Sequence, residues 1–247
     1  MATIKVYENA QQLSIEAAEL FVKTVEQAVQ SRGICHVSLA GGGTPRKTYE
    51  LLRSEPYCSR LPWQAIHFYW GDERCVPQTH SLSNQEMARQ AFLNHVAIPE
   101  ENIHPIIYED SPCDAAKNYE KVLHSTFSHQ APQFDFVFLG LGDDGHTASL
   151  FPGTDVLKVQ NDWVSHVYLQ EQDMYRVTLT PEILNQARMI AFLVTGQGKA
   201  QVIQKILEKT SASQSFPAQL IRPTHGEVYW LLDEEAASFL QSDINNT

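Results

Sequence analysis

The chain has 247 residues, of which 43% are hydrophobic and 19% charged, a composition typical of a globular protein with a sizeable core. Its 29 acidic and 18 basic residues give a formal net charge of -11, and such a surface repels nucleic acid and anionic membranes, so we expect neither as a partner. The N-terminus lacks a secretory signal, and no apolar run reaches the roughly 20 residues that cross a bilayer. The four cysteines lack CxxC spacing. We therefore expect a cytoplasmic protein with reduced thiols.

Short apolar stretches alternate with helical patterns along almost the whole chain. Strands are predicted at residues 4–7, 34–39, 66–70, 134–139, 163–167, 176–179, 189–194 and 228–232, and helices at 9–31, 44–52, 83–94, 111–129, 199–208 and 233–240. This alternation predicts an α/β fold with a doubly wound, mostly parallel sheet flanked by helices. We expect a single domain over residues 1–247, in which the irregular segments 54–62 and 153–173 are candidates for a small lobe.

A turn of three glycines, at positions 41–43, follows the strand at residues 34–39. We expect Thr44 to be the N-cap of the next helix and Pro45 its first residue, so that free N–H groups face the glycines. Such a helix start can bind an anion. A glycine turn that only reverses the chain direction explains the same residues equally well.

A polar cluster of Asp72, Glu73 and Arg74 follows the strand at residues 66–70. From these residues alone, an ion pair on the surface is favoured over a functional site. Ser83 and Glu86 then have the spacing of a capping box, which predicts a helix start next to Asn84.

The strand at residues 134–139 ends at Gly140, Gly142 and Gly145, which together satisfy the pattern GxGxxG of dinucleotide-binding proteins. We disfavour a dinucleotide here because Asp143 and Asp144 would repel a pyrophosphate, and Pro152 with Gly153 leaves little room for a helix.

The same turn places His146 close to Asp144 beyond the end of a strand. A lone histidine is more often structural than catalytic. A histidine held by glycines beside a carboxylate, at the edge of a sheet where ligands bind, is a candidate general base.

A last glycine turn leads to Lys199 at a predicted helix start, where a lysine can meet an anion, although a solvated lysine is at least as common there. In a parallel sheet the four strand ends at residues 41–46, 71–74, 140–146 and 196–199 share one edge, so we expect them to converge. The sequence has no GxSxG elbow and no HExxH motif, and we expect neither a covalent nucleophile nor a metal site.

Six segments carry a resemblance to a known family. They are GGGTPR at 41–46, WGDERCVP at 70–77, SN at 83–84, GLGDDGHTASLFPG at 140–153, RVTLTP at 176–181 and GQGKA at 196–200. Together and in this order they resemble the 6-phosphogluconolactonases, within the glucosamine-6-phosphate isomerase/6-phosphogluconolactonase superfamily. The resemblance implies a Rossmann-like fold and the hydrolysis of 6-phospho-D-glucono-1,5-lactone to 6-phosphogluconate, the second step of the oxidative pentose phosphate pathway.

The resemblance also implies roles for individual residues. His146 is similar to the family's general base and Asp144 to the carboxylate that orients it, whereas Arg74 matches the arginine near the reacting end. The positions that match the substrate site, most of them around the phosphate, are Gly42, Gly43, Thr44, Asn84, Arg176 and Lys199. The family implies no cofactor and no metal, and a small phosphosugar lactone as the only partner. We expect the protein to be a monomer.

Two alternatives remain at this point. The deaminase branch, which acts on glucosamine 6-phosphate, looks like DGHIAFNEPG in the same segment and has a glutamate where this chain has Phe151. A non-catalytic sugar-phosphate sensor could keep Thr44, Arg176 and Lys199 but has no need of Asp144 and His146. The sequence therefore favours the lactonase.

Overall fold

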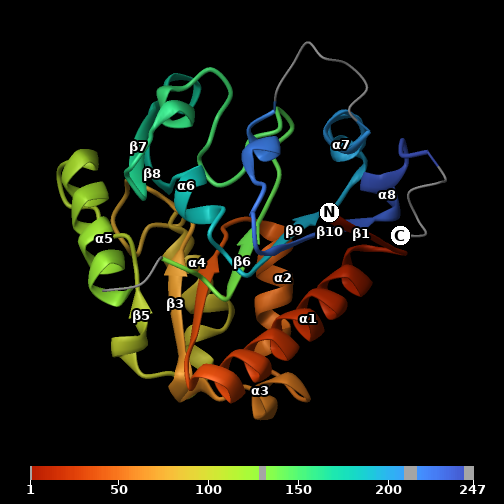
Figure 1. The fold of residues 1–247 in the computed structure, drawn as a ribbon, viewed down its shortest axis with the longest axis horizontal. Coiled ribbons are helices and arrows are strands. Elements are labelled where there is room, and N and C mark those ends of the chain that lie inside the picture. Colours follow the sequence, from red (N-terminus) through yellow and green to blue (C-terminus); the bar gives the residue numbers. More distant parts are fainter. Residues whose placement is uncertain (1, 128–131, 209–215, 242–247) are drawn as a thin grey trace.

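The computed structural model describes residues 2–127, 132–208 and 216–241, and its centre is a seven-stranded sheet flanked by helices (Figure 1). The strand order is β1-β10-β9-β6-β2-β3-β5, and each neighbouring pair runs parallel. The predicted α/β class with a mostly parallel sheet is therefore confirmed. The strands are β1 (Ala2–Tyr7), β2 (Cys35–Leu39), β3 (Ile66–Trp70), β5 (Ile103–His104), β6 (Phe136–Leu139), β9 (Met189–Val194) and β10 (Glu227–Asp233).

Three further strands form a separate antiparallel sheet in the order β4-β8-β7. They are β4 (Asp72–Arg74), β7 (Val164–Leu169) and β8 (Met174–Leu179). The sequence predicted β7 and β8 as strands but β4 as an irregular polar cluster. β4 follows β3 after Gly71 alone, and its pairing with β8 sets Arg74 directly opposite Arg176.

Four helices begin where the sequence predicted a helix start. Asn9, Ser83, Ser111 and Asp233 each accept a backbone N–H of the first turn that follows. The predicted helix at 111–129 ends at Thr126, and residues 128–131 lie outside the described part. The helices are α1 (Ala10–Arg32), α2 (Gly43–Leu52), α3 (Tyr57–Arg60), α4 (Asn84–Ala91), α5 (Pro112–Thr126), α6 (Pro181–Leu184), α7 (Ala200–Leu207) and α8 (Glu234–Ala237).

Two predictions about helices were wrong. Thr44 is not the N-cap of α2, because the cap is Gly42 and the helix already begins at Gly43. Gly42 has φ 99°, a conformation open to glycine, and this lets the chain enter the helix two residues earlier than expected. The segment at residues 54–62, expected to be a loop, contains the short helix α3.

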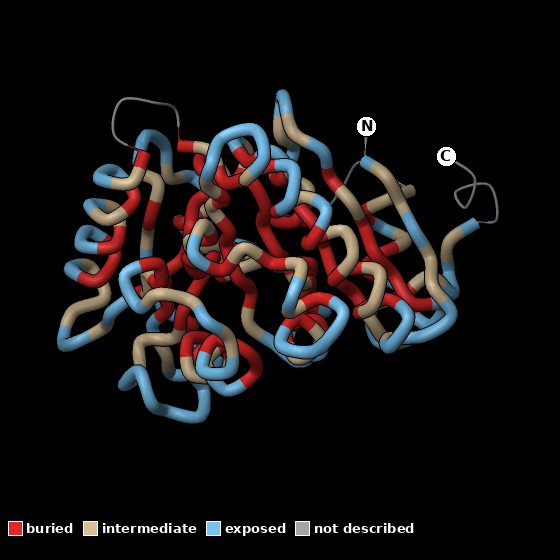
Figure 2. Tube along the Cα trace, turned by 90° about the horizontal axis from the view of Figure 1, so that it is seen from below, coloured by how far each residue is buried: buried red, intermediate tan, exposed pale blue. Residues whose placement is uncertain are grey.

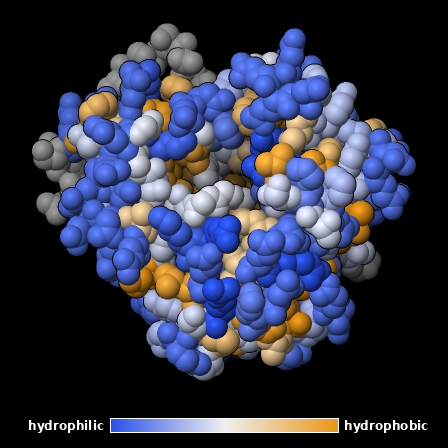
Figure 3. Space-filling model, turned by 180° about the vertical axis from the view of Figure 1, so that it is seen from behind, coloured by the Kyte–Doolittle hydropathy of each residue, from blue (hydrophilic) through white to orange (hydrophobic). Residues whose placement is uncertain are grey.

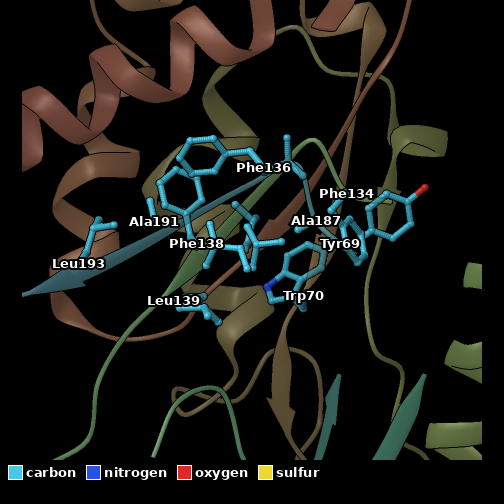
Figure 4. Packing of buried hydrophobic residues seen from close by; sticks show 14 of the residues in the cluster. Tyr69, Trp70, Phe134, Phe136, Phe138, Leu139, Ala187, Ala191 and Leu193 are labelled. Atoms are coloured by element: carbon cyan, nitrogen blue, oxygen red, sulfur yellow. The ribbon is translucent and has the colours of Figure 1, made fainter. Parts of the chain in front are cut away.

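The core lies between the central sheet and its helices, where the buried residues form the inner layer of the molecule (Figure 2). All four residues of β6 are buried, and Phe136 and Phe138 meet Phe21 of α1 at ring-centroid distances of 5.5 and 5.4 Å. Figure 4 shows Phe136 and Phe138 packed with residues of β3 and β9. The burial of β6 on both faces of the sheet explains its unbroken apolar run. On the surface, hydrophilic residues cover most of the face seen in Figure 3, as expected for a chain of this charge.

Three histidines meet across β2, β3 and β5. His36 lies opposite His67 in the ladder, and the Nδ1 atom of His67 is 3.0 Å from the Nε2 atom of His104. Burial, together with a smaller effect of the neighbouring histidines, lowers the pKa of His36 and that of His104 to about 4. The pKa of His67 is also lowered by burial. The folded state therefore favours the neutral form of the cluster.

We expect this cluster to make folding stability depend on pH. An unfolded histidine titrates near pH 6.5, so between about pH 6.5 and pH 4 the unfolded chain binds more protons than the folded one. The histidine contribution to the free energy of unfolding is complete above this window and is lost as pH falls through it. A double variant with His36→Phe and His104→Phe keeps two rings in place but removes the titration of these two histidines, so its urea midpoint should fall less than that of the wild type between pH 7 and pH 5. An equal fall in both proteins would contradict the assignment.

Candidate functional site

The predicted strand ends converge on one cavity of about 350 Å³. Residues from the turns after β2, β6 and β9 line it, together with residues of β4, β8 and the start of α4. Of the residues predicted for the site, eight line the cavity: Gly42, Gly43, Thr44, Arg74, Asn84, His146, Arg176 and Lys199. Asp144 lies behind this lining, in contact with His146.

His146 is held by a tight turn of the backbone. The N–H of Gly142 donates to the carbonyl of His146 at 2.8 Å, and the N–H of Gly145 donates to the carbonyl of Gly142 at 3.0 Å. Asp144 Oδ1 lies 2.6 Å from Nδ1 of His146 and also accepts the backbone N–H of His146 at 3.1 Å. When Nδ1 donates its proton to this carboxylate, Nε2 is left as the nitrogen that can accept one.

Phe151 fixes the plane of this imidazole. Its ring is stacked on that of His146 with centroids 3.9 Å apart and planes 25° from parallel. The guanidinium of Arg176 also lies over the ring of Phe151, 5.6 Å from its centroid. One aromatic side chain therefore links the histidine to a cation of the same cavity, a role that the sequence did not indicate.

Arg74 and Arg176 are opposite each other on β4 and β8, so their side chains share one face of the small sheet. Arg74 Nη1 donates to the carbonyl of Leu82, and Arg176 Nη2 donates to Oε1 of Gln172, each at 2.5 Å. Burial lowers the pKa of Arg176 from its ordinary value, and the charge of Arg74 lowers it further, although Asp72 acts in the opposite direction. Within the described residues, the Nε atoms of both arginines are buried without a hydrogen-bond partner. An anion in the cavity would relieve this arrangement.

The acidic pair before Arg74 is buried, and the expected surface ion pair is therefore wrong. Glu73 is 4% exposed, and its carboxylate accepts the backbone N–H groups of Arg74, Asn84 and Gln85 and the hydroxyl of Ser83. Burial raises the pKa of Glu73, and these hydrogen bonds partly offset the rise. Glu73 thus ties β4 to the start of α4.

Asp72 and Asn84 complete this support. Asp72 Oδ2 accepts the hydroxyl of Ser149 at 2.7 Å and lies 3.7 Å from Nη1 of Arg176. The amide nitrogen of Asn84 donates to the carbonyl oxygen of Asp72 at 2.9 Å and lies 3.3 Å from its Oδ1 atom. Asp72 lines the cavity but was not among the predicted site residues; its buried role depends on long-range contacts that the sequence does not show.

The start of α2 and the turn after β9 also line the cavity. The hydroxyls of Thr44 and Thr195 are 2.8 Å apart, which joins the two turns. Lys199 ends the 3-10 turn Gln197–Lys199 that precedes α7, and its ammonium group contacts a carboxylate oxygen of Asp143. Backbone N–H groups of α2, two hydroxyls and one ammonium are together suited to hold an anion.

Metal-binding clusters and membrane-spanning helices are both absent from the described residues, 2–127, 132–208 and 216–241. Among them no group of three or more His, Cys, Asp or Glu side chains could hold a metal ion. No helix within these ranges combines the length and the apolar character that crossing a membrane requires.

Comparison with known proteins gives consistent matches. A family model described as glucosamine-6-phosphate isomerases/6-phosphogluconolactonase matches residues 8–230. A 6-phosphogluconolactonase from Synechocystis is 42% identical over 235 residues, which cover 93% of this chain and 95% of the relative. The solved structure of 6-phosphogluconolactonase from Trypanosoma brucei has a TM-score of 0.87 at 33% identity, over 98% of this chain and 99% of that one. A monomeric glucosamine-6-phosphate deaminase, at 24% identity and a TM-score of 0.81 over 96% of this chain and 99% of that one, shares the fold.

The support given by Glu73 predicts a measurable effect on stability. Glu73→Ala should lower the free energy of unfolding by about 3 kcal/mol or more, since it leaves several buried donors without an acceptor. Glu73→Gln keeps one acceptor oxygen and should fall between this variant and the wild type. Urea denaturation at pH 7 measures both, and an alanine variant as stable as the wild type would show that the carboxylate does not hold β4 and α4 together.

Proposed function

Because the chain belongs to the glucosamine-6-phosphate isomerase/6-phosphogluconolactonase family, we propose that it hydrolyses 6-phospho-D-glucono-1,5-lactone to 6-phosphogluconate with His146 as the general base. The observation that carries this proposal is the pairing of His146 with Asp144 at the cavity that Arg74, Arg176 and Lys199 also line. Hydrolysis of a phosphorylated lactone requires both proton transfer and anion binding.

The proposed reaction begins with a water molecule beside Nε2 of His146. As the water oxygen attacks the lactone carbonyl carbon C1, Nε2 takes its proton, and the imidazolium is stabilised by the carboxylate of Asp144 at Nδ1. Negative charge then develops on the former carbonyl oxygen, and Arg74 is the cation that we assign to it. When the ring C–O bond breaks, the imidazolium returns the proton to the leaving ring oxygen, and the ring opens to the acid. No covalent intermediate is needed.

We assign the substrate phosphate to the anion-binding groups of the same cavity. The N–H groups at the start of α2, the hydroxyl of Thr44 and the ammonium of Lys199 are the donors there. Arg176 lies between Phe151 and Asp72, and its unpaired Nε makes it the further cation for the phosphate. Asn84 supports β4 through Asp72 and lines the cavity, where its amide oxygen is an acceptor for a sugar hydroxyl.

The deaminase is the second candidate because a monomeric glucosamine-6-phosphate deaminase has the same fold. Phe151 argues against it. The family resemblance gives the deaminase branch a glutamate immediately before Pro-Gly, and here that position carries an aromatic ring stacked on His146. Ring opening and isomerisation need this additional proton carrier, whereas hydrolysis of a lactone does not.

A pair of assays tests the choice of reaction. Lactone is supplied fresh by glucose-6-phosphate dehydrogenase, and its disappearance should be accelerated by the protein far above the spontaneous rate. Ammonia release from glucosamine 6-phosphate should stay at background, because Phe151 cannot transfer a proton. Ammonia release without lactone turnover would favour the deaminase, and sugar-phosphate binding with neither activity would favour a sensor.

Substitution of the proposed base gives a residue-level prediction. His146→Ala should lower kcat about 10²- to 10⁴-fold, the usual contribution of a positioned base, while binding of 6-phosphogluconate measured by calorimetry stays nearly intact. His225→Ala, at an exposed histidine that does not line the cavity, is the matched control and should keep normal turnover. Turnover of the His146 variant near the wild-type rate would remove this residue from the mechanism.

A further inference from the structure

We propose that Asp143 is an internal counter-ion of Lys199, which the phosphate of the substrate displaces on binding and which returns to the lysine as the product leaves. A carboxylate oxygen of Asp143 contacts the ammonium of Lys199 directly. Lys199 lines the cavity, whereas Asp143 does not. The proposal rests on the proposed function, because it takes the anion at Lys199 to be a phosphate.

The turn after β6 directs its two adjacent carboxylates to two different side chains of the cavity. Asp144 binds the imidazole of His146, and Asp143 binds Lys199, which lies 56 residues further along the chain. The backbone of the turn that carries Asp143 and Asp144 is held by hydrogen bonds. Gly142 and Gly145 donate within the turn, and the N–H of Ala218 donates to the carbonyl of Gly145 at 3.0 Å. Exchange at Lys199 therefore needs only a rotation of the Asp143 side chain and leaves Asp144 in place.

Exposure makes such an exchange easy. The side chain of Asp143 is 81% exposed and that of Lys199 is 25% exposed, so the carboxylate already contacts water on most of its surface. When it leaves Lys199 it becomes fully hydrated, and the phosphate that replaces it keeps the ammonium paired. The ion pair between Asp72 and Arg176 is different, since their side chains are 9% and 10% exposed, and neither carboxylate nor guanidinium can leave without burying an unpaired charge.

The consequence concerns how firmly phosphorylated ligands are held. A phosphate dianion must replace the carboxylate of Asp143, so part of its attraction to Lys199 is offset. The offset applies equally to the substrate and to 6-phosphogluconate, because both carry the phosphate. Asp143 thereby weakens retention of the product, and in its absence phosphate ligands should bind more tightly.

A double-mutant cycle tests this exchange, with inorganic phosphate and 6-phosphogluconate as probes and calorimetry as the measurement. Asp143→Asn should lower the Kd of each probe roughly two- to fivefold, the size expected for an exposed ion pair. Asp155→Asn is the matched control, because it removes the same charge from an exposed Asp–Lys pair, with Lys158, outside the cavity. It should change the Kd by less than about 1.5-fold. Lys199→Ala should raise the Kd about tenfold or more.

The cycle is completed by combining Asp143→Asn with Lys199→Ala, and in this background the gain from Asp143→Asn should disappear. A Kd that is unchanged or raised by Asp143→Asn, while Lys199→Ala weakens binding, would overturn the counter-ion proposal alone. A gain that persists in full without Lys199 would also overturn it, since the effect would then come from net charge. If Lys199→Ala leaves phosphate binding unchanged, the assignment of the phosphate to Lys199 is wrong, and the counter-ion proposal is overturned with it.

Discussion

The site depends on two places where the chain approaches itself too closely for any Cβ atom. A Cβ on Gly142 would lie 2.0 Å from Nδ1 of His146 and 2.7 Å from Oδ1 of Asp144. A Cβ on Gly41 would lie 1.9 Å from Oδ1 of Asn84. The first contact lets the imidazole lie against its own turn, and the second lets α4 and β4 close against the start of α2. Both are required because a parallel sheet brings its strand ends to one edge but does not itself press them together.

The sequence predicted the strands of the main sheet except the two-residue β5, and the convergence of their ends, because these follow from local patterns. Apolar runs that end at glycines mark β2, β6 and β9, and the rule for parallel sheets then brings the turns together. The convergence of these glycine turns on one cavity could therefore be predicted from the sequence. The specific roles of His146, Arg74 and Lys199 came from the family resemblance and remain predictions.

What the sequence could not show depends on contacts between distant segments. Asp72 and Glu73 read as a surface ion pair because nothing nearby in the chain reveals that Ser149 and the start of α4 supply their hydrogen bonds. The antiparallel sheet was missed because three residues of β4 are too short for a pattern, although its partner β8 was recognised. The stacking of Phe151 on His146 was hidden for the opposite reason: the two residues are close in sequence, but only the turn between them decides that their rings meet.

An acidic protein that binds an anion must reverse the sign of its charge locally, and at this cavity two cationic side chains and the histidine lie against carboxylates. Arg176, Lys199 and His146 each have a carboxylate neighbour, and the three carboxylates differ in how freely they can move. Asp72 is buried and holds its arginine in place, and Asp144 is fixed by both the ring and the backbone of His146. Asp143 alone of these three is mostly exposed and bound through one contact. Burial of Asp72 and the two hydrogen bonds of Asp144 therefore distinguish two fixed pairs from Lys199, whose partner can be exchanged, and an anion entering the cavity should compete with Asp143 before it disturbs the other two pairs.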